Sequence, residues 1–203
     1  MAVEETKADP FQITARRIVY ENAWITVEHQ DVVRPDGKPG IYGIVRFANR
    51  AVGVLPIDDQ GYVWLVGQYR RPLAAWSWEM PEGGVPHDED LMAGARRELE
   101  EETGLRAAHL IRVLDLDLSN SVSDETATCF VAYGLSQGLA APEGTEILSQ
   151  RRIHFSKLME EVVTGEIRDS LTVATVYRTY HLVHTNQLPV VLSQAMLAMP
   201  EGD

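Results

Sequence analysis

The sequence predicts an α/β fold with a mixed β-sheet and helices on its faces. Strand-like runs dominate the first third of the 203 residues, and helical patterns are interspersed with strands only after them. The runs 51–57 and 62–68 flank Asp58-Asp59-Gln60-Gly61, which has the composition of a tight hairpin turn. Strands grouped early and helices interspersed later favour a sheet that is covered by helices.

The N-terminal segment from Ile13 to Phe47 is strand-like throughout. A turn is expected at residues 34–40, which contain two prolines and two glycines. The candidate strands are 18–20, 24–27 and 41–47.

A central helix is predicted over residues 88–103, after a loop at 81–86. Asp88 is the expected N-cap, and Gly104 stands where a left-handed residue ends a helix. Leu91, Ala95 and Leu99 are four residues apart and form an apolar stripe that would face a core.

The C-terminal half predicts two more strands and two more helices. The strands are expected at 111–118 and 126–135, and the helices near 156–163 and at 169–184. The prediction of a helix at 169–184 conflicts with the β-branched residues in this segment, because such residues favour strands.

Charge and composition exclude several classes of protein. The formal net charge of −12 argues against a nucleic-acid partner, and no apolar run approaches the length of a membrane span. The single cysteine, Cys129, excludes an internal disulfide framework and is expected to be a small core residue. With no apolar segment near the N-terminus, we expect a soluble cytoplasmic protein.

Three carboxylates of the central helix form a candidate metal site. Glu98, Glu101 and Glu102 lie at i, i+3 and i+4, so they share one helical face and repel one another. A divalent cation relieves this repulsion, and hard oxygen ligands suit Mg²⁺ or Mn²⁺. We expect Glu102 to be exposed until metal binds. The alternative is an ordinary solvated helix face.

The spacing around these glutamates resembles the Nudix box, G-x5-E-x7-R-E-U-x-E-E-x-G-U, where U is aliphatic. The match covers residues 83–105 and agrees at every defined position, which chance would give roughly once in ten million. The matching residues are Gly83, Glu89, Arg97, Glu98, Leu99, Glu101, Glu102, Gly104 and Leu105. Gly83 would let the loop turn toward the metal, and Glu89 and Arg97 could bridge to stiffen the loop and the helix.

The resemblance implies a fold, a reaction and a metal site. Nudix proteins have an α/β/α sandwich around a mixed β-sheet, here preceded by an N-terminal strand region. Family members hydrolyse a nucleoside diphosphate linked to another group, by attack of water on phosphorus with divalent metal ions. The expected ligands are Glu98, Glu101, Glu102 and the backbone carbonyl of Glu82.

The flanking segments resemble the ADP-ribose and nucleoside diphosphate sugar pyrophosphatases of the family. Gln68-Tyr69-Arg70 is similar to their Q-Y-R segment, and residues 78–83 are similar to E-x-P-A-G, with Glu82 in place of alanine. The resemblance would place Arg70 on the substrate phosphates; otherwise it is a surface arginine. A proline expected within residues 119–125 is missing, which weakens ADP-ribose as the specific substrate.

The resemblance extends to the catalytic acid–base groups. Aligning on residues 165–170 places Glu146 on a glutamate of a flexible catalytic loop, with Glu143 nearby. These residues and Glu101 are the catalytic candidates, and Glu146 would act as general base or late metal ligand. The alternative is an acidic surface loop.

The N-terminal strands predict a dimer. In this branch such strands commonly form the subunit interface and contribute to the partner's base pocket. Tyr20 and Trp24 are candidates for stacking on the base, unless they pack in the core, and Arg46 is a further candidate substrate contact. We therefore divide the chain into residues 1–48, for dimerisation and base binding, and residues 49–203, the Nudix hydrolase domain.

The expected function is Mg²⁺-dependent hydrolysis of ADP-ribose or a related nucleoside diphosphate sugar to a nucleoside monophosphate and a sugar phosphate. One alternative is a catalytically idle module that binds a nucleotide metabolite. The other is a house-cleaning pyrophosphatase acting on nucleoside triphosphates.

Overall fold

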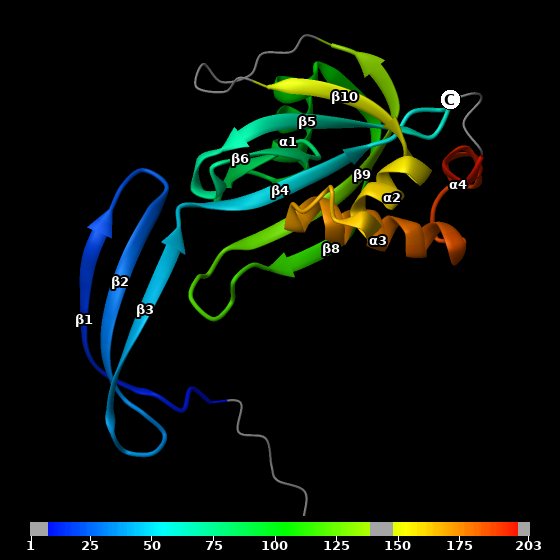
Figure 1. Ribbon diagram of the computed structural model, residues 1–203. Helices are drawn as coiled ribbons and strands as arrows, with labels where there is room; N and C mark the ends of the chain where they lie inside the picture. The colour runs from blue at the N-terminus through cyan, green and yellow to red at the C-terminus, as the bar shows by residue number, and fades with distance from the viewer. Residues whose placement is uncertain (1–7, 139–147, 199–203) are drawn as a thin grey trace, which may run out of the picture. The chain divides into compact units, whose positions relative to one another are not determined.

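The computed structural model describes residues 8–138 and 148–198, which form two compact units (Figure 1). The first unit contains Met1–Asn49 and Asp117–Glu125, and the second contains Arg50–Leu116 and Thr126–Asp203. The connection 117–125 therefore belongs to the N-terminal unit, although it lies between two strands of the second.

The first unit is an antiparallel sheet of three strands in the order β1-β2-β3. The strands are β1 (Gln12–Glu21), β2 (Ile25–Val33) and β3 (Pro39–Phe47). The predicted turn between the last two is confirmed, with Gly37 at φ 78°, which glycine adopts without strain. The connection 117–125 contacts β3, where the N–H of Val45 donates to the carbonyl of Val122 at 2.8 Å.

The second unit contains two further sheets. The sheet β7-β4-β9-β8 includes a parallel pair, β4 with β9, whereas the sheet β10-β5-β6 is antiparallel. The strands are β4 (Asn49–Pro56), β5 (Tyr62–Arg70), β6 (Ala75–Glu79), β7 (Glu82–Pro86), β8 (Leu105–Asp117), β9 (Thr126–Gln137) and β10 (Ser149–His154), with a short 3-10 helix, η1 (Arg71–Leu73), after β5. The mixture of parallel and antiparallel pairs confirms the predicted α/β class.

Helices cover both faces of the four-stranded sheet (Figure 1). The helices of this unit are α1 (Leu91–Thr103), α2 (Phe155–Thr164), α3 (Ser170–His184) and α4 (Val190–Leu197), of which α1 and α3 pack against the four-stranded sheet. Val52 and Val54 of β4 pack with Ala95 and Leu99 of α1 in one buried cluster. Gly53 faces the other way, toward Leu171 of α3. The alternation of side chains along β4 thus places α1 and α3 on opposite faces.

The core positions agree with the predicted apolar pattern. Ala95 and Leu99 have no exposed surface, and Leu91 packs against the same cluster. Cys129 is a buried free thiol, as expected, and burial raises its pKa to about 11. Among the described residues, no helix is both long and apolar enough to cross a membrane.

Three local predictions need correction. The helix α1 begins at Leu91 rather than at 88, and its N-cap is Asp90, which accepts a hydrogen bond from the N–H of Ala93 at 3.0 Å. Both Asp88 and Asp90 have a side chain that can cap a helix, so composition alone does not choose between them. The predicted loop 81–86 is largely strand β7, because pairing with β4 overrides the low strand propensity of Gly83, Gly84 and Pro86 at a sheet edge.

Residues 58–61 form the predicted turn, but the strands on either side of it, β4 and β5, do not continue as a hairpin. The N–H of Gly61 donates to the carbonyl of Asp58 at 3.0 Å, and Ile57 and Val63 form a single antiparallel bridge. Beyond that bridge, β4 and β5 belong to different sheets. The strands β6 and β10 and the helix α4 were not predicted at all.

Candidate metal and active site

The carboxylate of Glu98 on α1 lies directly over the backbone of Gly83 in β7. A Cβ atom on Gly83 would be only 2.3 Å from the Cδ of Glu98, which no real contact permits. The glycine of the motif is therefore required for the close approach of a carboxylate, in addition to any freedom it gives the chain. The side chain of Glu98 is 12% exposed, which excludes a freely solvated position.

Glu102 is more buried than expected. Only 3% of its surface is exposed, so the expectation of an exposed side chain is wrong. Its Oε2 accepts a hydrogen bond from the backbone N–H of Glu82 at 3.0 Å, and this bond ties the last turn of α1 to the start of β7. The burial of Glu102 and the low exposure of the Glu98 side chain also argue against the alternative of an ordinary solvated helix face.

Arg97 links the loop to the helix, as predicted. Its Nη2 lies 3.4 Å from the Oε2 of Glu89 and donates to the carbonyl of Gly84 at 3.1 Å. Its Nη1 donates to Glu98 at 2.7 Å and to Glu101 at 3.1 Å. Burial lowers the pKa of Arg97, but these carboxylates outweigh it and raise the pKa overall. The guanidinium of Arg97 thus holds two of the three candidate metal ligands, Glu98 and Glu101.

Arg70, at the end of β5, is paired with two carboxylates. Its Nε donates to both oxygens of Glu79 at 2.9 and 3.0 Å, and its Nη2 donates to the Oε1 of Glu82 at 2.7 Å. Glu79 is buried, whereas the side chain of Arg70 is 35% exposed, so only the carboxylate of this bidentate pair is shielded from solvent. The glutamate at position 82 therefore adds a second carboxyl partner for Arg70.

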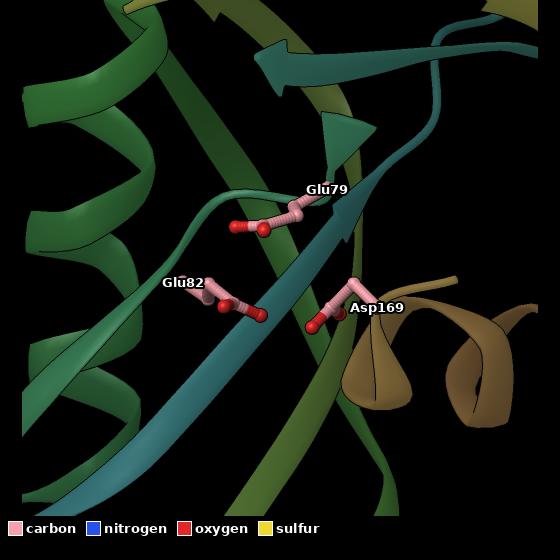
Figure 2. A group of neighbouring side chains, drawn as sticks. All are labelled: Glu79, Glu82 and Asp169. Carbon is pink, nitrogen blue, oxygen red and sulfur yellow. The ribbon is translucent and has the colours of Figure 1, made fainter. Parts of the chain in front are cut away.

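Asp169 completes an acidic group with Glu79 and Glu82. One carboxylate oxygen from each lies within 4.8 Å of the others, and Figure 2 shows the three side chains converging from the end of β6, from β7 and from the start of α3. Burial raises the pKa of Glu82 well above its ordinary range, and the charges of Asp169 and Glu79 raise it further. The Oε2 of Glu82 is buried and has no hydrogen-bond partner among the described residues.

Neither Glu79 nor Asp169 was predicted to be a site residue, although both lie in segments that resemble the pyrophosphatases. Their neighbours explain how they are held. The side chain of Asp169 caps α3 by accepting from the N–H of Thr172 at 2.7 Å, and the hydroxyl of Thr172 accepts from the N–H of Met80 at 2.9 Å. The end of β6 and the start of α3 are thus joined through one buried threonine.

The other predicted site residues are outside this group. Tyr20 and Trp24 lie in the first unit and are 55% and 71% exposed, so they do not pack in a core. Arg46, also in the first unit, pairs with Asp124 at 3.2 Å and Glu28 at 3.6 Å. Glu143 and Glu146 lie outside the described residues.

The residues present fit a divalent metal ion. The donors are all oxygen, which suits Mg²⁺ or Mn²⁺ better than a soft metal. Two carboxylates are buried against β7, and the Oε2 of Glu82 is buried without a partner in the described part of the chain. A buried unpaired carboxylate oxygen is costly, and a cation would compensate it.

Comparison with known families identifies two matching domains. The NUDIX domain matches residues 48–171, and the nucleoside diphosphate sugar hydrolase N-terminal domain matches residues 11–45. The first match covers more than half of the chain.

Individual relatives match more than half of this chain. A methanol dehydrogenase activator of Bacillus methanolicus is 29% identical over 160 residues, which cover 78% of this chain and 86% of that protein. An ADP-ribose pyrophosphatase of Bacillus subtilis (strain 168) is 34% identical over 122 residues, which cover 60% of this chain and 65% of that enzyme, just under two thirds.

A solved structure shows the same fold. The crystal structure of an ADP compounds hydrolase superposes with a TM-score of 0.80 and covers 90% of this chain and 98% of that chain. At 20% sequence identity, this likeness concerns the fold alone.

Proposed function

Because this chain belongs to the Nudix family, we propose that it hydrolyses the pyrophosphate bond of ADP-ribose or a related nucleoside diphosphate sugar in a Mg²⁺-dependent reaction. Water adds to one phosphorus and the bridging oxygen leaves on the other phosphate. The products are a nucleoside monophosphate and a sugar phosphate. Mn²⁺ is an alternative metal, since its ligand preferences are similar.

One observation supports this proposal above the others. The carboxylates of Glu98 and Glu102 are both held against the first residues of β7, one over Gly83 and one on the N–H of Glu82. This arrangement brings side chains of α1 next to the backbone carbonyl that the family resemblance makes a metal ligand. A helix with a merely solvated acidic face needs no such contacts.

The roles of individual residues follow from these positions. Glu98, Glu101, Glu102 and the carbonyl of Glu82 would hold the metal, which supplies neutralisation of the charge that develops on the diphosphate. Arg97 orients Glu98 and Glu101 through its hydrogen bonds. Arg70 would contact the substrate phosphates, and its bonds to Glu79 and Glu82 would hold the guanidinium in place.

The attacking water needs a group that accepts its proton. Glu146 is the proposed general base, with Glu143 and Glu101 as further candidates. A carboxylate suits this role because it is ionised at neutral pH and can form a hydrogen bond to water. A lower kcat in Glu146→Gln with an unchanged KM would support this assignment.

We further propose a homodimer whose first units pair. The three-stranded sheet of the first unit exposes large apolar side chains, which an interface between two copies would cover. They are Ile18, Val19, Tyr20 and Ile41 on the strands, and Trp24 in the connection between β1 and β2 is exposed as well. Tyr20 and Trp24 would stack on the base of the substrate, and Arg46 would add a charged contact. The free thiol of Cys129 fits the reducing cytoplasm.

The test is a screen of nucleoside diphosphate sugars, dinucleotides and nucleoside triphosphates with Mg²⁺, with Mn²⁺ and with chelator. Chromatography should show metal-dependent release of a nucleoside monophosphate from a nucleoside diphosphate sugar. Preferential cleavage of triphosphates would favour a house-cleaning enzyme. Thermal stabilisation by ADP-ribose without any turnover would favour an idle binding module.

A further inference from the structure

Arg50 lies in β4, outside the Nudix box, and its guanidinium binds the loop that precedes α1. Its Nη2 donates to the carbonyl of Glu89 at 2.7 Å and to that of Pro86 at 3.1 Å, and the carbonyl of His87 lies at 3.5 Å. The two short contacts match the two hydrogens of this nitrogen, and the third is at the outer limit of a hydrogen bond.

The loop held in this way carries Glu89. The main chain of Glu89 is bound by Arg50, whereas its side chain pairs with Arg97 at 3.4 Å. Arg97 in turn donates to Glu98 and Glu101. A continuous series of contacts therefore connects β4 to the carboxylates of α1.

A further main-chain hydrogen bond of this loop is local. The N–H of Glu89 donates to the carbonyl of Pro86 at 3.1 Å, which closes a turn onto the last residue of the edge strand β7. The contacts from Arg50 attach the same loop to β4, which is a central strand of the sheet and has buried apolar side chains. Strand β4 is thus a rigid support for a loop that has no apolar anchor of its own at Asp88 or Glu89.

We propose that Arg50 is a positioning residue for the metal site: it fixes the backbone of residues 86–89 so that Glu89 holds Arg97 against Glu98 and Glu101. This inference rests on the proposed function, since it assigns those two carboxylates to the metal. Contacts behind the direct ligands of a metal commonly change metal affinity about 10- to 100-fold when they are removed.

The chemistry of the side chain explains why arginine is needed. A guanidinium is planar and offers several N–H groups at fixed angles, whereas a lysine ammonium is a single flexible point. All of these contacts come from the single nitrogen Nη2. Lysine would keep the charge and has three N–H donors, but its flexible ammonium lacks the plane that fixes the position of Nη2. Methionine would keep much of the apolar length and lose every hydrogen bond.

The experiment measures Mn²⁺ binding directly by electron paramagnetic resonance, without substrate, for Arg50→Met, Arg50→Lys and Arg178→Met. Arg178 is the matched control, because its Nε also donates to a backbone carbonyl, that of Val113 at 3.1 Å, between α3 and β8. Thermal unfolding shows whether each variant is folded.

We expect Arg50→Met to weaken Mn²⁺ binding about tenfold or more, Arg50→Lys to show a smaller loss and Arg178→Met to bind as the wild type does. In turnover assays, the Mg²⁺ concentration for half-activation should rise in Arg50→Met, whereas the KM for substrate at saturating Mg²⁺ should change little.

Equal Mn²⁺ affinity in Arg50→Met and the wild type would overturn the inference. If Arg50→Met fails to fold, Arg50→Lys decides in the same way: weakened binding supports the inference and unchanged binding overturns it. A wild type that binds Mn²⁺ but cleaves no nucleoside diphosphate sugar would contradict the proposed function. The Mn²⁺ affinities of the variants would still show whether Arg50 positions the metal site.

Discussion

The backbone N–H of Glu82 donates a hydrogen bond to the Oε2 of Glu102 at 3.0 Å. This bond joins the first residue of β7 to the last turn of α1. Glu102 therefore has a structural partner as well as a proposed place in the metal site. Since the side chain is 3% exposed, a substitution must preserve its volume and its acceptor if its chemical role is to be tested separately.

Glu102→Gln satisfies both conditions. The amide oxygen of glutamine can still accept from the N–H of Glu82, so we expect a folded protein. Loss of the negative charge should lower turnover by orders of magnitude, because a neutral amide is a weaker ligand for Mg²⁺. The measurement is kcat, with thermal unfolding as the test of fold.

Glu100→Gln is the control for this variant. Glu100 lies on the same helix and pairs with Arg106 at 2.6 Å. This substitution also removes one carboxylate from α1, but from a position outside the proposed site. We expect it to keep most of the activity. Equal turnover in the two variants would remove Glu102 from the metal site.

Gly83→Ala should displace the carboxylate of Glu98. The added methyl group would lie within 2.3 Å of that carboxylate, so either β7 or the glutamate must move. We expect metal affinity to fall about tenfold or more, as for other changes beside a metal ligand. Isothermal titration with Mn²⁺ measures the effect.

Gly43→Ala is a suitable comparison for Gly83→Ala. Gly43 lies in β3, and a Cβ placed there meets nothing within 4 Å. This variant should bind Mn²⁺ as the wild type does. Unchanged Mn²⁺ affinity in Gly83→Ala would mean that the position of Glu98 is not important for the metal.

Contacts between residues that are close in sequence could be predicted from the sequence. Glu89 and Arg97 are eight residues apart, and their predicted bridge is present. The end of α1 at Gly104, with φ 71°, is also as predicted, because a left-handed residue after a helix favours glycine. Helical periodicity placed Ala95 and Leu99 in the core.

Contacts that depend on tertiary structure could not be predicted in this way. Asp169 and Glu82 are far apart in sequence, and only the packing of α3 against the sheet brings their carboxylates together. The burial of Glu102 likewise depends on β7, whose glycines and proline give it no strand-like pattern. Sequence periodicity predicts neither the proximity of Asp169 to Glu82 nor the burial of Glu102 against β7.

The ionisation of Glu82 should make stability depend on pH. Its pKa is raised in the folded protein, so the folded state retains the proton to a higher pH than the unfolded chain does. The cost of ionisation is therefore absent below the ordinary carboxyl pKa of 4.5. This cost grows as the pH rises from there toward the raised pKa and is constant above it.

Glu82→Gln should remove this cost. We expect the variant to have a higher Tm than the wild type at pH 8 in the presence of chelator, and a similar Tm at pH 4. A gain of 1 kcal/mol would correspond to about 2–4 °C for a chain of this size. Glu21→Gln, on the exposed strand β1, is the control. A variant less stable than the wild type at pH 8 would show that the bond to Arg70 outweighs the cost of the buried charge.

Trp24→Ala tests the proposed base contact of the first unit. The side chain is 71% exposed, so its loss should change the free energy of unfolding by less than about 0.5 kcal/mol. Stacking of an aromatic ring on a base contributes about 1–3 kcal/mol, so KM for a nucleoside diphosphate sugar should rise about tenfold with little change in kcat.

Ile41→Ala separates stacking from a general loss of apolar surface. Ile41 lies on β3 in the same unit and is also 71% exposed, but it has no aromatic ring. Sedimentation of both variants measures association, so a KM effect caused by dissociation of the dimer can be recognised. If Trp24→Ala and Ile41→Ala raise KM equally while both stay dimeric, Trp24 does not stack on the base, and recognition of the base must depend on other residues.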